Sequence, residues 1–223
     1  MNITTQRTVR GLSGYLVENQ PDIKCHKMTS FGFGPIVGIA LVAFLLPSFA
    51  SAGTIFLGND TNGPVQMFST SGTFLGLFGQ GGATGSALDG AGHVFTVAPN
   101  FGANQIKRYD AVGNLLNSFT AAVGGNWIED MAMGAGNTIW AGTYEGNIFK
   151  IDATTGATIS SFNVANSSFT GVAFDGTNLW ATAGLSGDAI YKYDALGNLV
   201  STIHTGVING GLGYDRETNT LWA

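Results

Sequence analysis

The chain has 223 residues and a formal net charge of −5, with 34 glycines and only five prolines. Residues 53–223 have five basic side chains against twelve acidic ones, a formal charge of −7. Because phosphate binding depends on clustered Lys and Arg, we expect no nucleic-acid partner. The single cysteine, Cys25, excludes an intramolecular disulfide.

The first 52 residues are typical of targeting rather than of a folded domain. Residues 1–27 have no apolar pattern, and we interpret them as a non-structural extension, with translation starting at or slightly before Met28. Residues 28–52 form a predicted secretory signal, with the apolar stretch 36–46 followed by the small residues Ala50-Ser51-Ala52, and the basic residues Lys24, His26 and Lys27 precede it. We expect cleavage after Ala52 and an extracellular or periplasmic bacterial protein. An uncleaved anchor is the alternative, although an apolar core of 11 residues is short for a membrane span.

The rest of the chain is built from one repeated segment. Its copies begin at Val65, Gln105, Asn147 and Ala189. The equivalent residues Phe68, Tyr109, Ile151 and Tyr193 are 41, 42 and 42 residues apart. A repeat of this length with strand-like segments is typical of the blades of a β-propeller.

A second repeated element has the pattern of a hairpin, in which two apolar runs flank a Gly, Asp or Asn turn. Its copies span 87–95, 131–140, 172–180 and 212–222. Together the two elements predict four antiparallel strands per repeat, which in the best-formed copy are 171–174, 178–182, 189–193 and 199–203. We therefore predict an all-β chain in which residues 53–223 form a propeller of about four repeats of ~42 residues.

The segments FSTSGTFLGLFG, SALDGAGHVFTV and QIKRYDAVGNLL resemble the NHL-type β-propeller repeat and its six-bladed relatives. The resemblance covers residues 53–223 and implies architecture rather than activity. The family and its relatives include protein-binding and RNA-binding modules, sugar-lactone hydrolases and lyases.

Two blade arrangements fit the repeats, because residues 54–57 match a second strand rather than a first one. In one arrangement residues 211–215 supply the missing first strand and close a four-bladed ring. In the other the sequence is a fragment of a six- or seven-bladed propeller, which would leave an open sheet edge. A sorting signal beyond residue 223 is a further expectation of that second arrangement.

Repeated polar residues have a structural interpretation. Asp110, Asp152 and Asp194 precede Gly-containing turns, so we expect Asx turns, and Asp89, Asp175 and Asp215 are interpreted in the same way. We expect Phe95, Trp140, Trp180 and Trp222 to form an apolar layer between blades. Lys107, Lys150 and Lys192 fall at related positions and are expected to be solvated.

Candidate binding residues are those that break the repeat. In a propeller, the loops between blades and the loops between second and third strands open on the same face. The candidates on this face are Trp127, Glu129, Asp130, Tyr144 and Glu145. Their oxygen atoms could hold Ca²⁺, so calcium is the one cofactor considered, and otherwise no cofactor is expected.

The function expected from these features is a secreted, non-enzymatic binding module that engages a protein or polysaccharide through its loop face. The alternative, which follows from the family resemblance, is a Ca²⁺-dependent hydrolase or lyase of the lactonase-like, six-bladed type. That enzyme would need several acidic or His side chains around the central channel. Only His93 and His204 follow the signal, at unrelated repeat positions, and no catalytic residue is assigned.

Overall fold

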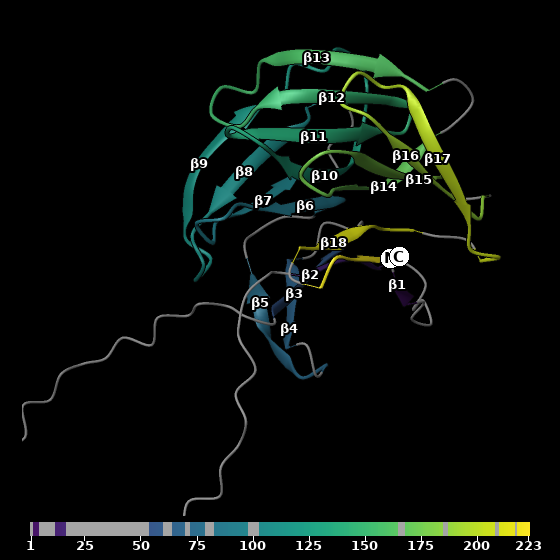
Figure 1. Ribbon diagram of the computed structural model, residues 1–223. Coiled ribbons are helices and arrows are strands. Elements are labelled where there is room, and N and C mark those ends of the chain that lie inside the picture. Colours follow the sequence, from purple (N-terminus) through teal and green to yellow (C-terminus); the bar gives the residue numbers. More distant parts are fainter. Residues whose placement is uncertain are drawn as a thin grey trace, which may run out of the picture.

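The computed structural model describes residues 2–4, 12–16, 54–59, 64–69, 72–78, 83–97, 103–164, 168–184, 187–207, 210–216 and 218–223. All regular elements in these ranges are strands (Figure 1), so they include no helix that could cross a membrane. The predicted signal segment 28–52 and its cleavage site after Ala52 lie outside the described residues.

Four antiparallel sheets of four strands form the blades of a propeller, as predicted, and we number them in chain order. Blade 1 contains β2 (Leu12–Leu16), β3 (Thr54–Asn59), β4 (Val65–Ser69) and β5 (Phe74–Phe78). Blade 2 contains β6 (Gly85–Leu88), β7 (Val94–Val97), β8 (Gln105–Tyr109) and β9 (Leu115–Thr120). Blade 3 contains β10 (Ile128–Gly134), β11 (Thr138–Thr143), β12 (Asn147–Asp152) and β13 (Thr158–Asn163). Blade 4 contains β14 (Phe169–Phe174), β15 (Leu179–Ala183), β16 (Ala189–Tyr193) and β17 (Leu199–His204).

A fifth, three-stranded sheet lies between blades 4 and 1. Its strands are β1 (Asn2–Thr4), β19 (Thr220–Trp222) and β18 (Gly213–Asp215), with β1 parallel to β19. Strand β18 approaches both β14 and β2, which completes a ring of first strands. The sequence suggested residues 211–215 as the first strand of the opening blade, but β18 pairs with β19, and β2 from the N-terminal segment takes that place.

The residues that define the repeat period mark an irregularity in every blade. The pairing of the third and fourth strands shifts register at Phe68, Tyr109, Ile151 and Tyr193. A β-bulge increases local strand twist. The period read from the sequence is therefore the spacing of four equivalent bulges, each next to the turn that starts the outer strand.

The turns at these bulges have the predicted Asx geometry. Asp110 Oδ1 accepts hydrogen bonds from the backbone N–H groups of Val112 and Asn114, at 3.0 and 2.8 Å. Asp194 Oδ1 does the same with Leu196 and Asn198, both at 2.9 Å. Asp152 Oδ1 accepts from the N–H groups two and three residues ahead. The structural interpretation of this aspartate set is confirmed.

Hydrophobic side chains fill the space between neighbouring sheets. Phe95 packs with Ile128 and Ile139 of the next blade, and Trp140 packs with Phe169 and Val172. Trp180 packs with Leu212 and Leu221 of the fifth sheet. The predicted aromatic layer is therefore present at three successive interfaces, while Trp222 is half-buried.

A cationic side chain from the adjacent third strand lies over each of these three aromatic rings. Arg108 lies 5.5 Å from the ring centre of Phe95, Lys150 lies 5.3 Å from Trp140, and Lys192 lies 4.7 Å from Trp180. Such contacts are attractive because the ring face is electronegative. The equivalent of Lys150 and Lys192 is therefore Arg108 rather than Lys107, because Arg108 is the residue paired with the aromatic position.

Asp175 completes this arrangement in blade 4. Its Oδ2 accepts a hydrogen bond of 2.9 Å from the Trp180 indole and lies 3.8 Å from Lys192 Nζ. Gly134 occupies the same position in blade 3, and among the described residues the Trp140 indole N–H has no partner. Burial tends to raise the pKa of Asp175, but hydrogen bonds from the N–H groups of Asn178 and Thr177 and from the indole lower it overall.

The first strands approach each other closely at a position that is glycine in blades 2 and 4. A Cβ on Gly171 would lie 2.7 Å from the backbone N of Leu212, and one on Gly85 would lie 2.5 Å from Cα of Asp130. Such contacts involve backbone atoms, which cannot move aside as a flexible side chain can. The absence of a side chain therefore sets the spacing between these blades.

The first prediction concerns this close approach. Gly171→Ala should lower the free energy of unfolding by roughly 1–3 kcal/mol, because the new methyl group overlaps the backbone of the fifth sheet. Urea denaturation measures the loss. Gly90→Ala is the matched control, because a Cβ there meets nothing within 4 Å. Equal stability of the two variants would contradict the packing described.

The second prediction concerns Asp175. Asp175→Ala should cost roughly 1–3 kcal/mol at neutral pH, because it leaves the Trp180 indole without its acceptor. The lowered pKa of Asp175 stabilises the fold above about pH 4, and this contribution is lost as pH falls through that pKa. Denaturation at pH 7 and pH 3 should therefore show a smaller difference from wild type in acid. Asp194→Ala, which removes only an exposed turn contact, should cost less at pH 7.

Candidate functional site

The loop that enters blade 3 and the hairpin between β11 and β12 meet at one end of the blade. The rings of Trp127 and Tyr144 lie 6.4 Å apart, centre to centre, at an angle of 43°. The Trp127 backbone N–H donates to Glu145 Oε2 at 2.8 Å, and the Tyr144 N–H donates to the Trp127 carbonyl at 2.9 Å. We call Trp127, Tyr144 and Glu145 the blade-3 loop site.

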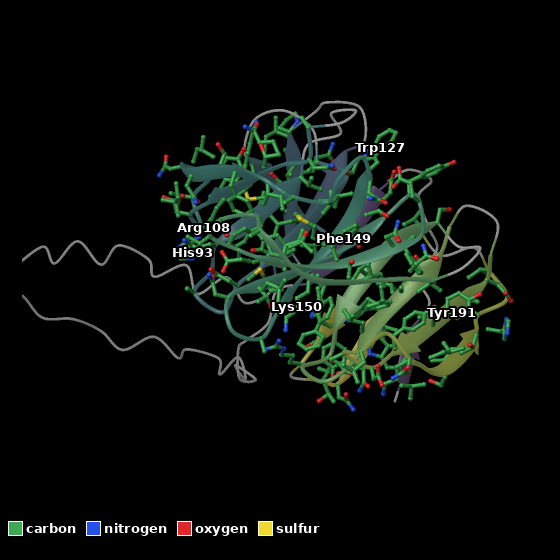
Figure 2. All side chains as sticks on the ribbon, turned by 90° about the horizontal axis from the view of Figure 1, so that it is seen from above. His93, Arg108, Trp127, Phe149, Lys150 and Tyr191 are labelled. Carbon is green, nitrogen blue, oxygen red and sulfur yellow. The ribbon has the colours of Figure 1, made fainter. Side chains whose placement is uncertain are left out.

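Hydrogen bonds to backbone groups fix the two loops of this site, while its side chains remain accessible to solvent. Tyr144 is 52% exposed, Glu145 is exposed and Trp127 is half-buried. Figure 2 shows Trp127 at one edge of the molecule, well apart from His93 and Arg108. The arrangement presents an apolar ring surface beside a carboxylate.

A row of asparagine side chains crosses the same loops. Asn104 donates to the Asn126 carbonyl at 2.6 Å, and Asn147 donates to the Asn126 side-chain oxygen at 2.6 Å. Asn163 donates in turn to the Asn147 side-chain oxygen at 2.8 Å. The row ends at Asn163, which is exposed. Because each amide orients the next, the loops are fixed relative to one another.

Two further candidates from the sequence, Glu129 and Asp130, lie on β10 and not on the loop. Glu129 is half-buried, whereas Asp130 is 0% exposed. Asp130 Oδ2 accepts a 2.7 Å hydrogen bond from the backbone N–H of Val172, so its carboxyl group connects blade 3 to blade 4. It stands at the repeat position that Gly85 and Gly171 occupy in blades 2 and 4.

The position of Asp130 has an electrostatic consequence. Burial raises the pKa of its carboxyl group well above the ordinary value, and the N–H groups of Val172, Met131 and Ser86 offset only part of that rise. The carboxyl group therefore has a strong tendency to keep its proton. The buried Asp130 carboxyl group therefore acts as a hydrogen-bond acceptor between blades rather than as a surface charge.

Within the described ranges, no group of three or more His, Cys, Asp and Glu side chains is placed to hold a metal ion. Of the acidic candidates, Glu145 is exposed in the loop and Asp130 is enclosed between blades. A calcium ion at the loop site would therefore take Glu145 and neighbouring oxygen atoms as ligands, without the Asp130 side chain.

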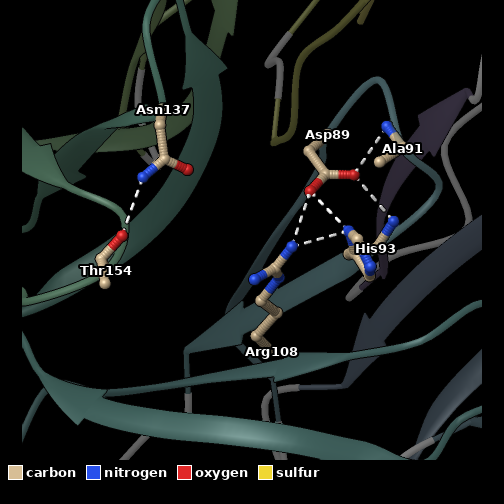
Figure 3. Close-up of polar contacts among 6 residues, drawn as sticks. All are labelled: Asp89, Ala91, His93, Arg108, Asn137 and Thr154. Carbon is tan, nitrogen blue, oxygen red and sulfur yellow. Dashed lines mark hydrogen bonds and ion pairs between the residues drawn. The ribbon is translucent and has the colours of Figure 1, made fainter.

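A charged cluster that the sequence analysis did not assign lies at the hairpin between β6 and β7 (Figure 3). His93 Nδ1 is 2.7 Å from Asp89 Oδ2 and 2.8 Å from a terminal nitrogen of Arg108. The ring nitrogen can donate to Asp89 or accept from Arg108, but not both at once. Burial tends to raise the pKa of Asp89, and hydrogen bonds from His93 and Ala91 lower it overall.

This cluster is the blade-2 counterpart of the contacts around Trp180. Asp89 matches Asp175, Arg108 matches Lys192 and Phe95 matches Trp180. The sequence contains a signal for this cluster, because an acidic residue, an aromatic residue and a cationic residue recur at fixed repeat positions. Because the same set recurs in blade 4, the cluster has a structural role in the hairpins.

No family model matches the chain, and no curated protein matches it. Among solved structures it is similar to the Chaetomium thermophilum Raptor protein, with a TM-score of 0.50 and 11% identity over 73% of this chain and 16% of that one. A computationally designed protein, Ika8, matches with a TM-score of 0.49 and 20% identity over 73% of this chain and 50% of that one. A chain of a mitotic checkpoint complex matches with a TM-score of 0.49 and 16% identity over 73% and 51%. The chain therefore spans about half or less of the length of these proteins, and at such identities the likeness concerns the fold alone.

The third prediction concerns Asp130. The unfolded state releases the proton of an aspartate near pH 3.9, whereas the folded state keeps it to higher pH, so ionisation disfavours folding as pH rises above about 4. Asp130→Asn keeps an oxygen that can accept from Val172 and cannot ionise. The stability of the variant relative to wild type should therefore increase from pH 4 to pH 8, as measured by urea denaturation across that range. Parallel pH profiles for the two proteins would contradict a buried, proton-retaining Asp130.

Proposed function

We propose that this protein is an exported, non-enzymatic propeller module that binds an extracellular protein or polysaccharide through the blade-3 loop site. The observation that carries the proposal is the contact between Trp127 and Tyr144, which lie in two different loops of blade 3. Aromatic residues at the rim of a rigid scaffold are common binding determinants, because they offer large contact area at low conformational cost.

The rigidity of the site supports this proposal. Glu145 accepts a hydrogen bond from the Trp127 backbone, and the asparagine row ties the neighbouring loops together. A preorganised surface loses little entropy when a partner binds. The propeller framework is consistent with a binding role, as are the repeats, which we propose to be of the NHL type.

Export is part of the proposal and rests on the sequence of residues 28–52. Strands β1 and β2 precede this segment, so cleavage after Ala52 would remove the first strand of blade 1 and one strand of the fifth sheet. The acidic balance of residues 53–223 fits a soluble extracellular module better than one that binds nucleic acid. The proposed partners are therefore extracellular polymers or proteins.

The fourth prediction tests the site. Purified full-length protein is mixed with the insoluble extracellular material of the producing cells, and the bound fraction is measured by sedimentation. Tyr144→Ala should weaken binding by roughly tenfold or more, as expected for an aromatic anchor. Phe74→Ala is the control, because Phe74 is 54% exposed on the outer strand of blade 1. Equal binding by wild type and Tyr144→Ala would contradict the proposed site.

A further inference from the structure

The blade-3 loop site and the asparagine row together place amide groups and one carboxylate, that of Glu145, around an apolar ring face. Tyr144 presents its ring to solvent, and Asn163 ends the row as an exposed side chain. The Asn163 amide nitrogen donates to Asn147 Oδ1 at 2.8 Å and to the Gly146 carbonyl at 3.4 Å, so its side-chain oxygen is the group that a hydroxyl would meet. Ligands with many hydroxyl groups on an otherwise apolar ring match this combination.

The charges near the site narrow the class of possible ligands further. The carboxylate of Glu145 is already bonded through Oε2 to the Trp127 N–H. Lys150, the basic residue of this blade, lies over the Trp140 ring, and Figure 2 shows it well away from Trp127. An anionic polymer would meet the Glu145 carboxylate here, and Lys150 is not placed to pair with it, which is unfavourable.

The backbone of the site also argues against capture of an extended peptide. Peptides that add to a sheet need an open strand edge. Trp127 lies in a connecting segment and Tyr144 in a turn, and the Trp127 N–H and carbonyl and the Tyr144 N–H are used within the site. Side chains rather than backbone groups are therefore the available contacts.

From these features, and resting on the proposed function, we infer that the blade-3 loop site binds a neutral polysaccharide. A sugar ring stacks on Tyr144, with its C–H groups against the aromatic face. Its hydroxyl groups donate hydrogen bonds to the side-chain oxygen of Asn163 and to the Glu145 carboxylate. The Trp127 ring supports Tyr144 from the side and extends the apolar surface.

The test is affinity electrophoresis of the full-length protein through gels that contain a neutral polysaccharide (a β-glucan, a mannan or dextran) or the anionic polysaccharide alginate. At least one neutral polysaccharide should slow wild type. Tyr144→Ala should weaken that binding roughly tenfold, and Asn163→Ala several-fold. Tyr144→Phe should bind like wild type because it keeps the ring. Phe74→Ala is the matched control, and unchanged melting temperatures exclude unfolding as the cause.

Other outcomes separate this inference from the proposed function. If no neutral polysaccharide slows the protein, or if alginate slows it most, the inference is wrong. If proteinase treatment of the extracellular material abolishes Tyr144-dependent binding whereas periodate, which cleaves sugar diols, does not, the partner is a protein. In that case the proposed binding role stands and the polysaccharide assignment fails. If wild type and Tyr144→Ala bind the extracellular material and every polysaccharide equally, both the proposed function and the polysaccharide assignment are wrong.

Discussion

The architecture depends on the close approach of first strands near the centre of the ring. Gly85 and Gly171 lie against the backbone of the next sheet at distances that leave no room for a Cβ. Once this spacing is fixed, neighbouring sheets diverge outward, and the space between them must be filled by larger side chains. Phe95, Trp140 and Trp180 on the second strands fill it. Small residues inside and aromatic residues further out are thus two results of one geometric constraint.

Asp130 is the exception that shows how tightly the centre is packed. In blade 3 a carboxyl group replaces the glycine, and it is accommodated because it accepts the Val172 N–H of the next blade. A hydrogen bond offsets much of the cost of burying a polar group. The interface between blades 3 and 4 therefore combines a polar contact at the centre with the apolar packing of Trp140 further out.

Local sequence signals predicted much of this fold, because repeat period, hairpin turns and Asx turns are encoded by neighbouring residues. The meeting of Trp127 and Tyr144 was also predictable, since both loop types open on one face of a propeller. The burial of Asp130 was not, because a register shift between Ile128 and Asp130 decides which way each side chain points. The asparagine row joins residues far apart in the chain, and β2 comes from a segment without an apolar pattern. These features arise from tertiary contacts, which cannot be predicted from patterns among neighbouring residues in the sequence.

The outer strands give the molecule an uneven surface. Strands β5, β9, β13 and β17 contain no Asp, Glu, Lys or Arg, and they expose apolar side chains such as Leu75, Leu116 and Val200. In the described part of the blades, the charged side chains lie on the inner strands and at the turns and loops. Electrostatic repulsion between two copies in solution therefore depends on their mutual orientation. It is weakest when the two copies approach with their outer strands facing each other. We therefore expect the outer strands, more than the net charge, to govern the colloidal behaviour of this protein at high concentration.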